Sequence, residues 1–595
     1  MPLPEYTGTL ELNRAAHLLR RATFGATKQQ IDTFAGYTPA QAVTQLFRQT
    51  LPDPILPVDP KTGQEWVISG TSNANSKDGE LEDYLMKWIV GQMMSSGVPG
   101  NLSLAYSARE KVVHFLHTHF TTIVSKVSSS RALYFQNQLF RLFALDSLDA
   151  RPIINFKKLT VKISVDNAML RLLDGNLNVK GSVNENYGRE LIELYSLGKG
   201  LEGTQPISNT PGDYYFYTEK DVQAAANVLT GWQDDDTFMN IDPDTLLPRG
   251  KVKGTTTNAS SHEPDTDVTK KKVFSSRFTS VLFPAPITIS PDPLLLNAGE
   301  PTEASALDEI DKLIELLYEQ VETRKRICWK IYRFYVASMH TVEDSLAIDG
   351  LIITEMANTF RDNGYKLQPV IENLLRSQHF YDSIDAVVKN DNFGGLIKSP
   401  VDLTLGMLRF FEFKIPDMAT SPDAFYTTTG EILSSIRSEG MNFYEPYDVS
   451  GYEAYHQWPI YHRAWITPNS LTTRYNFIRS VITAAEAGMF KVNTYDYVKN
   501  NISNAIARNS KDLVIELAKY FLPIAVNLSY VDDPSASLTS LRLNYFKKRF
   551  VQDFTTDPDA YWTTRWDAAT ELADMRLQLE FLFNAMLQSP EYQLA

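Results

Sequence analysis

The stretch "SVNENYGRELIELYSLGKG", residues 182–200, indicates the fold class of this chain. Its apolar residues recur three and four positions apart, the spacing that places them on one face of an α-helix. Ser182 and Glu185 have the spacing of a capping box, Asn184 is a second N-cap candidate, and Gly198 stands where a helix would stop. The stretch therefore predicts a capped amphipathic helix.

The same periodicity recurs along most of the sequence, which predicts a mainly α fold with a multi-helix, bundle-like architecture. Two stretches lack it. Residues 233–303 are rich in Asp, Pro, Thr and Ser and predict a long irregular excursion with a small β-hairpin, and residues 441–468 predict an aromatic, irregular loop. Further helices are expected at 12–24, 38–47, 79–97, 108–124, 128–145, 161–173, 218–231, 306–320, 324–338, 348–364, 366–377, 400–413, 469–488, 494–522, 537–552 and 565–588.

The chain has 595 residues, more than a single hydrophobic core usually organises. We therefore expect several regions, divided where the helical periodicity and the amino-acid composition of the sequence change. They are an N-terminal helical region (1–232), an irregular or β insertion, or alternatively a lid (233–303), a second helical region (304–440), the aromatic loop (441–468) and a C-terminal helical region (469–595).

Composition excludes some classes of function. The 57 basic and 71 acidic side chains give a net charge of −14 without a basic stripe, which argues against a nucleic-acid-binding protein. The single cysteine, Cys328, excludes thiolate metal clusters and is expected in the core. No apolar run reaches the roughly 20 residues of a membrane span, and the N-terminus lacks the pattern of a secretory signal. The chain is therefore expected in the cytoplasm, or exported through a removed signal or a partner.

Six blocks of the sequence resemble, in order, those of the bacterial DUF1800 family, whose function is unknown. The blocks are "HLLRRATFGAT" (17–27), "FLHTHF" (115–120), "NENYGRELIELYSLG" (184–198), "YTEKDVQAAANVLTGW" (217–232), "LIKSPVDLTLGMLRFF" (396–411) and "YEPYDVSGYEAYHQWPIYHRAWI" (444–466). The resemblance implies a bacterial protein, often exported. It also implies a co-encoded partner of the DUF1501 family, which is similar to alkaline-phosphatase and sulfatase folds and would carry the export signal.

The block "FLHTHF" offers two histidines as metal ligands. His117 and His119 lie two positions apart, so they share a face only if the segment is extended or the helix has ended. His114 and His117 would share a face of a continuous helix, but His114 lies outside the family-like block, and we favour His117 with His119. The alternative is a helix interior in which the imidazoles form hydrogen bonds with neighbouring side chains.

The helix predicted at 184–197 offers the acidic partners. A cap and pairs four residues apart, from Glu185 to Arg189 and from Arg189 to Glu193, explain most of its charges as a structural network. Glu190 is not needed for the cap, and it precedes Glu193 by three positions. Two such acids bind a divalent metal or share a proton, so Glu190 and Glu193 are predicted as ligands together with His117 and His119.

His262 is the third candidate. It lies in the excursion beside Glu263 and Asp265, and the family carries a histidine in a comparable position, so we interpret it as a metal ligand or an acid–base group. The alternative is an ordinary surface histidine. Thr218 and Asp221 predict another capping box.

The sequence lacks the motifs of nucleotide-binding proteins, α/β-hydrolases and zinc proteases. We therefore expect a metal-assisted hydrolase or oxidoreductase whose catalytic groups are Glu190, His117 and His262, with a divalent metal as its cofactor. One alternative is a non-catalytic helical scaffold that binds the co-encoded DUF1501-type protein through the aromatic loop. The other is a polymer-binding surface protein, suggested by the aromatic side chains of that loop.

Overall fold

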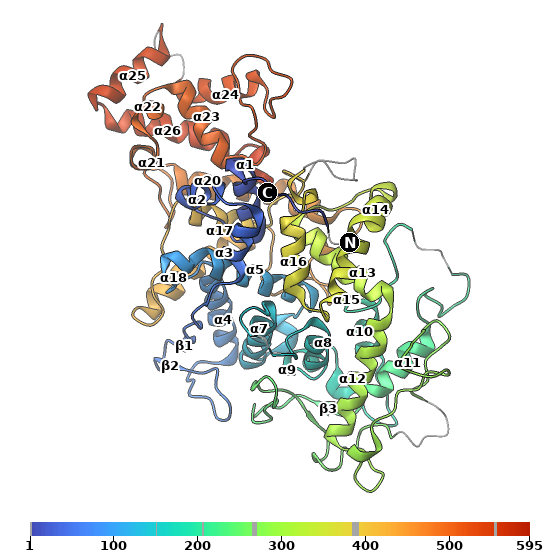
Figure 1. The fold of residues 1–595 in the computed structure, drawn as a ribbon. Coiled ribbons are helices and arrows are strands. Elements are labelled where there is room, and N and C mark those ends of the chain that lie inside the picture. Colours follow the sequence, from blue (N-terminus) through green and yellow to red (C-terminus); the bar gives the residue numbers. More distant parts are fainter. Residues whose placement is uncertain (1–2, 150, 205–207, 265–270, 383–391, 552–555) are drawn as a thin grey trace.

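The computed structural model describes residues 3–149, 151–204, 208–264, 271–382, 392–551 and 556–595. The fold is mainly helical, as the sequence predicts (Figure 1). Two antiparallel ladders complete the regular structure of the described residues. Strand β1 (Val58–Asp59) pairs with β2 (Gln64–Glu65), and β3 (Trp232–Gln233) pairs with β4 (Lys251–Val252) at the start of the predicted excursion.

The first half of the chain is built around α5, which is buried along almost its whole length and contacts α3, α4, α7 and α13. The helices of this half are α1 (Glu11–Ala22), α2 (Lys28–Ala35), α3 (Pro39–Phe47), α4 (Asp78–Met93), η1 (Gly100–Leu102), α5 (Ser103–His119), α6 (Val124–Val127), α7 (Ser130–Ala144), α8 (Phe156–Ser164), α9 (Asn167–Leu172), η2 (Gly175–Leu177), α10 (Asn186–Glu193) and α11 (Glu219–Val228). The side chain of Glu110 on α5 is buried and forms salt bridges with Arg109 at 3.0 Å and Arg141 at 2.7 Å.

The second half continues after the excursion. Its helices are η3 (Pro293–Leu295), α12 (Glu303–Glu319), α13 (Val321–Tyr335), α14 (Val342–Ile348), η4 (Asp349–Ile353), α15 (Thr354–Asp362), α16 (Leu367–Arg376), η5 (His379–Tyr381), α17 (Pro400–Phe410), α18 (Pro422–Ser438), α19 (Glu453–His456), η6 (Tyr461–Trp465), α20 (Pro468–Ile482), α21 (Thr494–Asn501), α22 (Asn504–Ala507), α23 (Ser510–Phe521), α24 (Ser540–Val551), α25 (Pro558–Ala568), α26 (Leu572–Leu587) and η7 (Glu591–Gln593).

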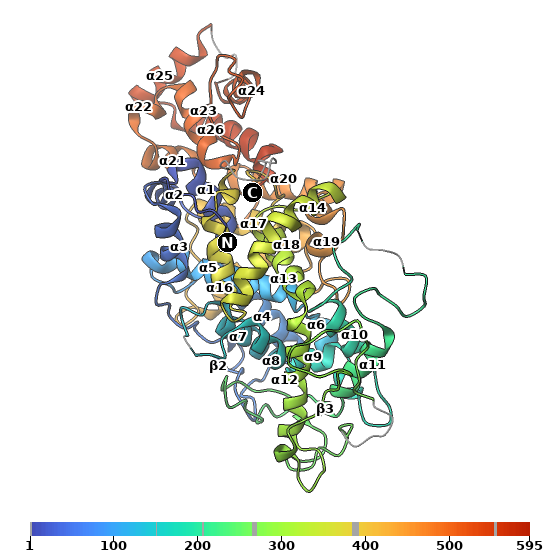
Figure 2. The ribbon, with the colours of Figure 1, turned by 45° about the vertical axis from the view of Figure 1, so that its right-hand side comes forward.

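The molecule is elongated. Helices α21 to α26 form one end, and the excursion lies at the opposite end in both views (Figures 1 and 2). Helices from distant parts of the sequence interleave between these ends, since α1 contacts α23 and α3 contacts α16. The end of α1 also lies against α17, because a Cβ added at Gly25, whose φ is +111°, would stand 2.6 Å from the Cα of Gly406. Two of the family-like blocks therefore meet at this close backbone approach.

Several predicted helices are interrupted for local reasons. The pattern at 161–173 is divided between α8 and α9, because the Asp166 side chain accepts a hydrogen bond from the Met169 amide and starts a new helix. The pattern at 565–588 is divided where Ala569 adopts a left-handed conformation. Helix α18, which begins at Pro422, was not predicted.

The predicted aromatic loop contains two short helices, α19 and η6. Tyr461 and Trp465 are buried, whereas Tyr447 is 94% exposed. Buried apolar side chains form one continuous cluster that runs through both halves of the chain. The predicted division into five regions therefore stays a prediction.

Candidate functional site

Helix α10, which carries Glu190, begins differently from the prediction. Asn184 Oδ1 accepts a hydrogen bond from the Asn186 amide at 2.9 Å. The predicted capping box is wrong, because Ser182 forms a backbone bridge with Val179 and the residue before α10 makes no side-chain capping bond. Asn184, the second candidate, thus organises this end through a local side-chain to backbone bond.

The capping contact predicted for α11 is confirmed. The Asp221 carboxylate accepts hydrogen bonds from the Thr218 amide at 2.7 Å and from the Thr218 hydroxyl at 2.8 Å. Helix α10 stops at Glu193, before the predicted stop at Gly198, whose amide donates to the Ile192 carbonyl at 2.9 Å. The predicted start of α11 is therefore confirmed, and the predicted end of α10 is wrong.

Only half of the predicted charge ladder on α10 forms. Arg189 lies 3.4 Å from Glu185, four residues earlier, but its main salt bridge is with Glu219 at the start of α11. Glu193 binds Lys199 at 2.5 Å rather than Arg189. The Arg189–Glu193 prediction is wrong because tertiary packing against α11 draws the guanidinium away from its own helix.

Glu190 has the properties of an acid–base group. Its side chain is half-buried. The carboxyl group forms no hydrogen bond or salt bridge with another described residue, and neighbouring charges act on it only at a distance. Burial, followed by the neighbouring Glu193 carboxylate, raises the pKa of Glu190 to about 7 against the opposing effect of Arg189. Near neutral pH this carboxyl group therefore exists in both protonation states.

A tyrosine hydroxyl lies within electrostatic reach of Glu190. Tyr195 is 1% exposed, and its hydroxyl has no hydrogen-bond partner among the described residues. Its amide donates to the Glu190 carbonyl at 3.2 Å. Burial, and then the Glu190 carboxylate, raises the pKa of Tyr195. The hydroxyl therefore stays protonated and keeps a free donor.

Two further groups come from other segments. Lys330 on α13 is mostly buried and donates to the Leu194 carbonyl, just beyond α10, at 3.0 Å. His456 on α19 has a buried Nε2 without a partner in the described chain. Burial, then Lys330, lowers the pKa of His456, whereas Asp448, which also acts on Glu190, raises it. Groups from α10, α13 and the aromatic loop thus share one neighbourhood, which we call the Glu190 region: Glu190, Tyr195, Lys330 and His456.

The two predicted histidine ligands point to different surroundings because α5 stays helical up to His119. The His117 ring stacks on Tyr444 with centroids 3.6 Å apart, and neither of its nitrogens has a hydrogen-bond partner in the described parts. The centroid of the His119 ring lies 5.1 Å from the centroid of the Phe156 ring and 6.2 Å from that of the Tyr195 ring. Burial holds the pKa of both histidines well below the usual value, so both are neutral.

Of these histidines, His119 is the one beside the Glu190 region. The positive charge of Lys330 further lowers its pKa, after burial. Within the described residues, no group of three or more His, Cys, Asp and Glu side chains is arranged to hold a metal ion. The predicted ligands His117, His119, Glu190 and Glu193 are therefore not gathered into one coordination sphere, and their metal-binding role stays a prediction.

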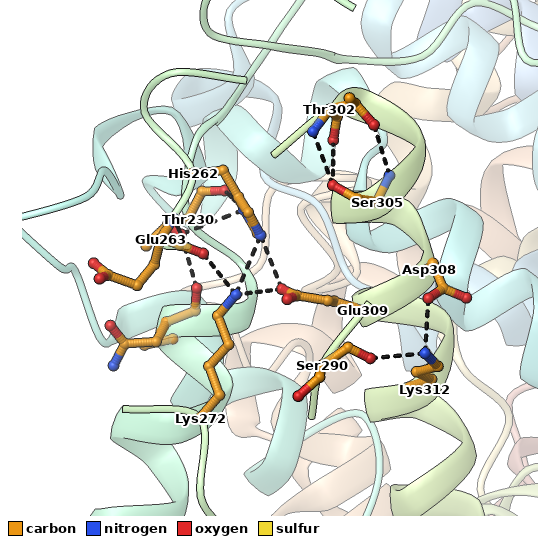
Figure 3. Close-up of polar contacts among 12 residues, drawn as sticks. Thr230, His262, Glu263, Lys272, Ser290, Thr302, Ser305, Asp308, Glu309 and Lys312 are labelled. Carbon is orange, nitrogen blue, oxygen red and sulfur yellow. Dashed lines mark hydrogen bonds and ion pairs between the residues drawn. The ribbon is translucent and has the colours of Figure 1, made fainter. Parts of the chain in front are cut away.

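His262 belongs to a separate buried network (Figure 3). Its Nδ1 donates to the Thr230 carbonyl at 2.8 Å, and its Nε2 lies 2.8 Å from Glu309 Oε2. Lys272 donates to the same Glu309 oxygen at 2.5 Å and to the Glu263 carbonyl at 2.7 Å. We call these four residues the His262 network: the side chains of His262, Lys272 and Glu309, and Glu263, which contributes its backbone carbonyl.

The network is enclosed rather than exposed at the surface. The exposed fractions are 2% for His262, 4% for Lys272 and 1% for Glu309. A Cβ added at Gly231, whose φ is +84°, would stand 2.6 Å from the His262 amide nitrogen, so the backbones approach closely here. Both imidazole nitrogens are occupied, and none of the contacts of His262 among the described residues involves His117, His119 or Glu190.

The comparison with known families decides the identity of the chain. The family model described as "Protein of unknown function (DUF1800)" matches residues 17–594. The chain belongs to the DUF1800 family. No curated protein and no solved structure matches it. For this DUF1800 protein, the described residues include no helix with the length and apolarity needed to cross a bilayer.

Sequence reasoning missed Lys272, Glu309 and Lys330 in this DUF1800 protein. Two of them carry a signal that helical spacing reveals. Glu309 lies on the buried face of α12, three residues after the buried Ala306. Lys330 lies four residues before the buried Phe334, on the same face of α13. A charged residue on an apolar helix face needs a partner or a function. Lys272, in an irregular segment, offers no such periodic signal.

Proposed function

We propose that this DUF1800 protein is an enzyme whose acid–base centre is Glu190. The observation that carries the proposal is the contrast among the acids of one short segment. Glu185 and Glu193 have salt-bridge partners, whereas the half-buried Glu190 carboxyl has none among the described residues and titrates at a pKa of about 7. Partial burial without a protein partner raises the pKa of a carboxyl group, and carboxyl groups with such raised pKa values gather at functional sites.

The surroundings of Glu190 suit proton transfer. A general acid or base works best when its pKa lies near the working pH, which a pKa of about 7 satisfies. The Tyr195 hydroxyl and the His456 Nε2 have no hydrogen-bond partner among the described residues, so we propose them as polar atoms that bind the ligand. Lys330 adds an amine next to His456, and burial, followed by the charges of Arg326 and Arg333, holds the pKa of Lys330 well below its usual value. Glu190 would therefore move the proton while its neighbours orient the ligand.

Hydrolysis is the reaction class that this arrangement supports best. Glu190 in its ionised form takes a proton from a water molecule, which then attacks the substrate. In its protonated form it returns the proton to the leaving group. We therefore favour a hydrolase over an oxidoreductase. His117, stacked on Tyr444, and His262, held in its own network, would contribute to this chemistry only indirectly.

The metal-assisted form of the proposal requires a divalent ion at Glu190. The predicted ligands nearest to one another are Glu190 and Glu193 on α10, with His119 beside Tyr195. Glu193 would have to release Lys199 and Tyr217 to bind an ion.

Elemental analysis of the purified protein tests the metal-assisted form. Any divalent ion found in the native protein should be lost in the Glu190→Gln variant and retained in Glu185→Gln. A protein that is active after chelation would rule the metal out while leaving Glu190 as the acid–base group.

The decisive experiment compares Glu190→Gln with Glu185→Gln as the matched control on the same segment. Hydrolysis is measured on panels of ester, phosphoester, glycoside and peptide substrates. We expect Glu190→Gln to lose activity by about 10²- to 10⁴-fold, the usual contribution of a general acid or base. Glu185→Gln should stay within about twofold of the native protein, because it loses only one long, part-buried ion pair, the contact with Arg189 at 3.4 Å.

A second measurement needs no substrate. Infrared difference spectra between pH 5 and 9 report the protonated carboxyl group directly. Burial also raises the pKa of Glu82 and Asp166 to about 7, so several carboxyl bands titrate in this range. We expect Glu190→Gln to lose one of these bands and Glu185→Gln to keep all of them. The proposal fails if Glu190→Gln loses no band that titrates in that range, or if no substrate class is turned over by the native protein.

The non-catalytic alternatives make a different use of the aromatic loop. As a docking face for a DUF1501-type partner, or as a polymer-binding surface, the loop would need exposed rings. Tyr447 is 94% exposed, but Tyr461 and Trp465 are buried, which supports packing as the main role of the aromatic side chains. Co-purification of the native protein with a DUF1501-type partner, abolished by Tyr447→Ala, would favour the docking alternative.

A further inference from the structure

The His262 network holds an amine, a carboxylate and an imidazole together in one enclosed place (Figure 3). Lys272 Nζ lies 2.5 Å from Glu309 Oε2. His262 Nε2 lies 2.8 Å from the same oxygen and 3.3 Å from Nζ, so the three atoms contact one another in a closed triangle. All three side chains are buried, and the chemistry open to them is therefore reaction with one another.

The lysine amine is held in place from a second side. Its Nζ also donates to the carbonyl of Glu263, the residue that follows His262, at 2.7 Å. Lys272 and Glu309 are 37 residues apart along the chain, and the fold brings their side chains into direct contact. Well-oriented groups held in this way react as if their concentration were about 10⁵–10⁸ M.

The contact between His262 and Glu309 requires a shared proton. A carbonyl oxygen only accepts hydrogen bonds, so the contact of His262 Nδ1 with the Thr230 carbonyl at 2.8 Å assigns a ring proton to Nδ1. In the neutral ring Nε2 then has no proton, and it would face the Glu309 carboxylate, a second acceptor, at 2.8 Å. A proton between the two atoms satisfies both, and the Lys272 ammonium, which contacts each of them, is its source.

Transfer of that proton produces the two groups that condense to an amide. Lys272 becomes a neutral amine with a lone pair, and Glu309 becomes a carboxylic acid bound to the imidazole. The ionised pair does not react directly, because an ammonium nitrogen has no lone pair and a carboxylate is a poor electrophile. The imidazole in contact with both groups is therefore the feature that makes this pair reactive.

We propose that Lys272 and Glu309 become joined by an amide bond between Nζ and Cδ, formed by the folded protein itself. The nitrogen lone pair attacks Cδ, and one carboxyl oxygen leaves as water. Two of the three ammonium protons pass through His262 Nε2 to the departing oxygen and the third stays on the amide nitrogen, so no other reactant is needed. The bond ties the excursion to α12 and involves no part of the Glu190 region, so it is independent of the proposed enzyme.

Burial favours the amide over the ion pair. Two charges taken out of water carry a desolvation penalty, which their attraction offsets only when the geometry is favourable. The amide is neutral, so this penalty disappears when the bond forms, and the released water returns to bulk solvent. A more exposed pair such as Lys158 with Asp311 carries little of this penalty and is expected to stay ionic.

A second buried pair, Lys111 with Asp402, shows what the imidazole adds. The side chains are 4% and 22% exposed and contact each other directly. His114 lies one helical turn after Lys111, but neither of its ring nitrogens has a hydrogen-bond partner among the described residues. No imidazole links the amine to the carboxylate here, so this pair is expected to stay ionic and provides a matched control.

The mass of the full-length protein tests the proposal. Electrospray measurement under denaturing conditions should give the mass of the sequence minus one water molecule. After digestion with trypsin, residues 272–277 should remain joined to residues 278–312, because the bond spans the cut at Arg277 and protects Lys272 from cleavage. A native mass equal to that of the sequence, or a loss of water located in any other peptide, would overturn the proposal.

Matched lysine variants assign the nucleophile. Lys272→Arg keeps the positive charge but removes the primary amine, and we expect its mass to equal that of its own sequence. Lys111→Arg makes the same change in the control pair, and we expect the loss of one water molecule to remain. A loss that persists in Lys272→Arg would show that another group reacts, and the proposal would fail.

His262→Gln tests the proton transfer. Glutamine keeps a polar side chain but cannot carry a proton from Nζ to the carboxyl group. We expect most of the purified variant to lack the joined peptide, since a general acid–base group contributes about 10²- to 10⁴-fold in rate. His262→Asn is a second variant should the first fold poorly by circular dichroism. A folded variant joined as completely as the native protein would contradict the role of His262.

Discussion

The Glu190 region and the His262 network both join acidic and basic side chains from distant segments, yet they differ in how far their polar atoms are satisfied. In the His262 network both ring nitrogens, the lysine and the Glu309 carboxylate make hydrogen bonds. In the Glu190 region, the Glu190 carboxyl, the Tyr195 hydroxyl and the His456 Nε2 lack partners within the described residues.

This difference separates two uses of buried charge. The hydrogen-bonded His262, Lys272 and Glu309 side chains rigidify the fold and join the excursion to α12 through the contact of His262 with Glu309. The buried Glu263 Oε2 is the exception, since it has no partner among the described residues. A polar group without a partner in the protein remains able to form a hydrogen bond with a ligand or to bind a proton. The comparison suggests a stabilising role for the His262 network and fits the chemistry proposed for the Glu190 region, and each prediction below tests one of the two.

The largest effect on stability is expected from Glu309→Ala. The substitution leaves Lys272 charged and buried without its carboxylate, and breaking a buried pair in this way costs about 3–5 kcal/mol. Urea unfolding measures the loss. Asp311→Asn on the same helix is the control, since its salt bridge with Lys158 at 2.5 Å is solvent-exposed and should contribute less than about 1 kcal/mol. Equal losses in the two variants would show that the network is not a stabilising element.

A smaller, pH-dependent effect is expected from Glu190→Gln. The folded pKa of Glu190, about 7, lies above that of an exposed glutamate, so the folded protein binds the proton more tightly than the unfolded chain does. The associated stability is complete below about pH 4.3 and is lost as the pH rises through 7.

Partial exposure of Glu190 to solvent reduces this contribution to roughly 1–2 kcal/mol. Melting temperatures at pH 5 and pH 8.5 measure it. Relative to the native protein, Glu190→Gln should be less stable at pH 5 than it is at pH 8.5. A difference that does not change with pH would contradict the raised pKa.

The sequence predicted the mainly α fold, because helical spacing is a local property that tertiary contacts reinforce. It also singles out Glu190 as a candidate, because Glu190 is the one acid of its helix that neither the cap nor a charge ladder requires, and its catalytic role stays a prediction. Tertiary contacts decided the rest. The pairing of Arg189 with Glu219 depends on α11, and the enclosure of His262 depends on Glu309, 47 residues away along the chain.

The smallest effect is expected from Tyr195→Phe, and it tests the comparison at the level of a single hydroxyl. The Tyr195 hydroxyl makes no hydrogen bond within the described chain, so its removal should change the free energy of unfolding by less than about 0.5 kcal/mol. Tyr217→Phe is the matched control, because the Tyr217 hydroxyl donates to Glu193 at 2.9 Å and its loss should cost about 1–3 kcal/mol.

Activity should reverse this order. If Tyr195 orients a ligand beside Glu190, Tyr195→Phe lowers the turnover of whichever substrate the native protein hydrolyses, while its stability stays unchanged. Tyr217→Phe, which disturbs Glu193 rather than Glu190, should lower stability more than turnover. A Tyr195→Phe variant with reduced stability and full activity would show that the hydroxyl serves the fold, and the distinction between the two regions would no longer hold at this position.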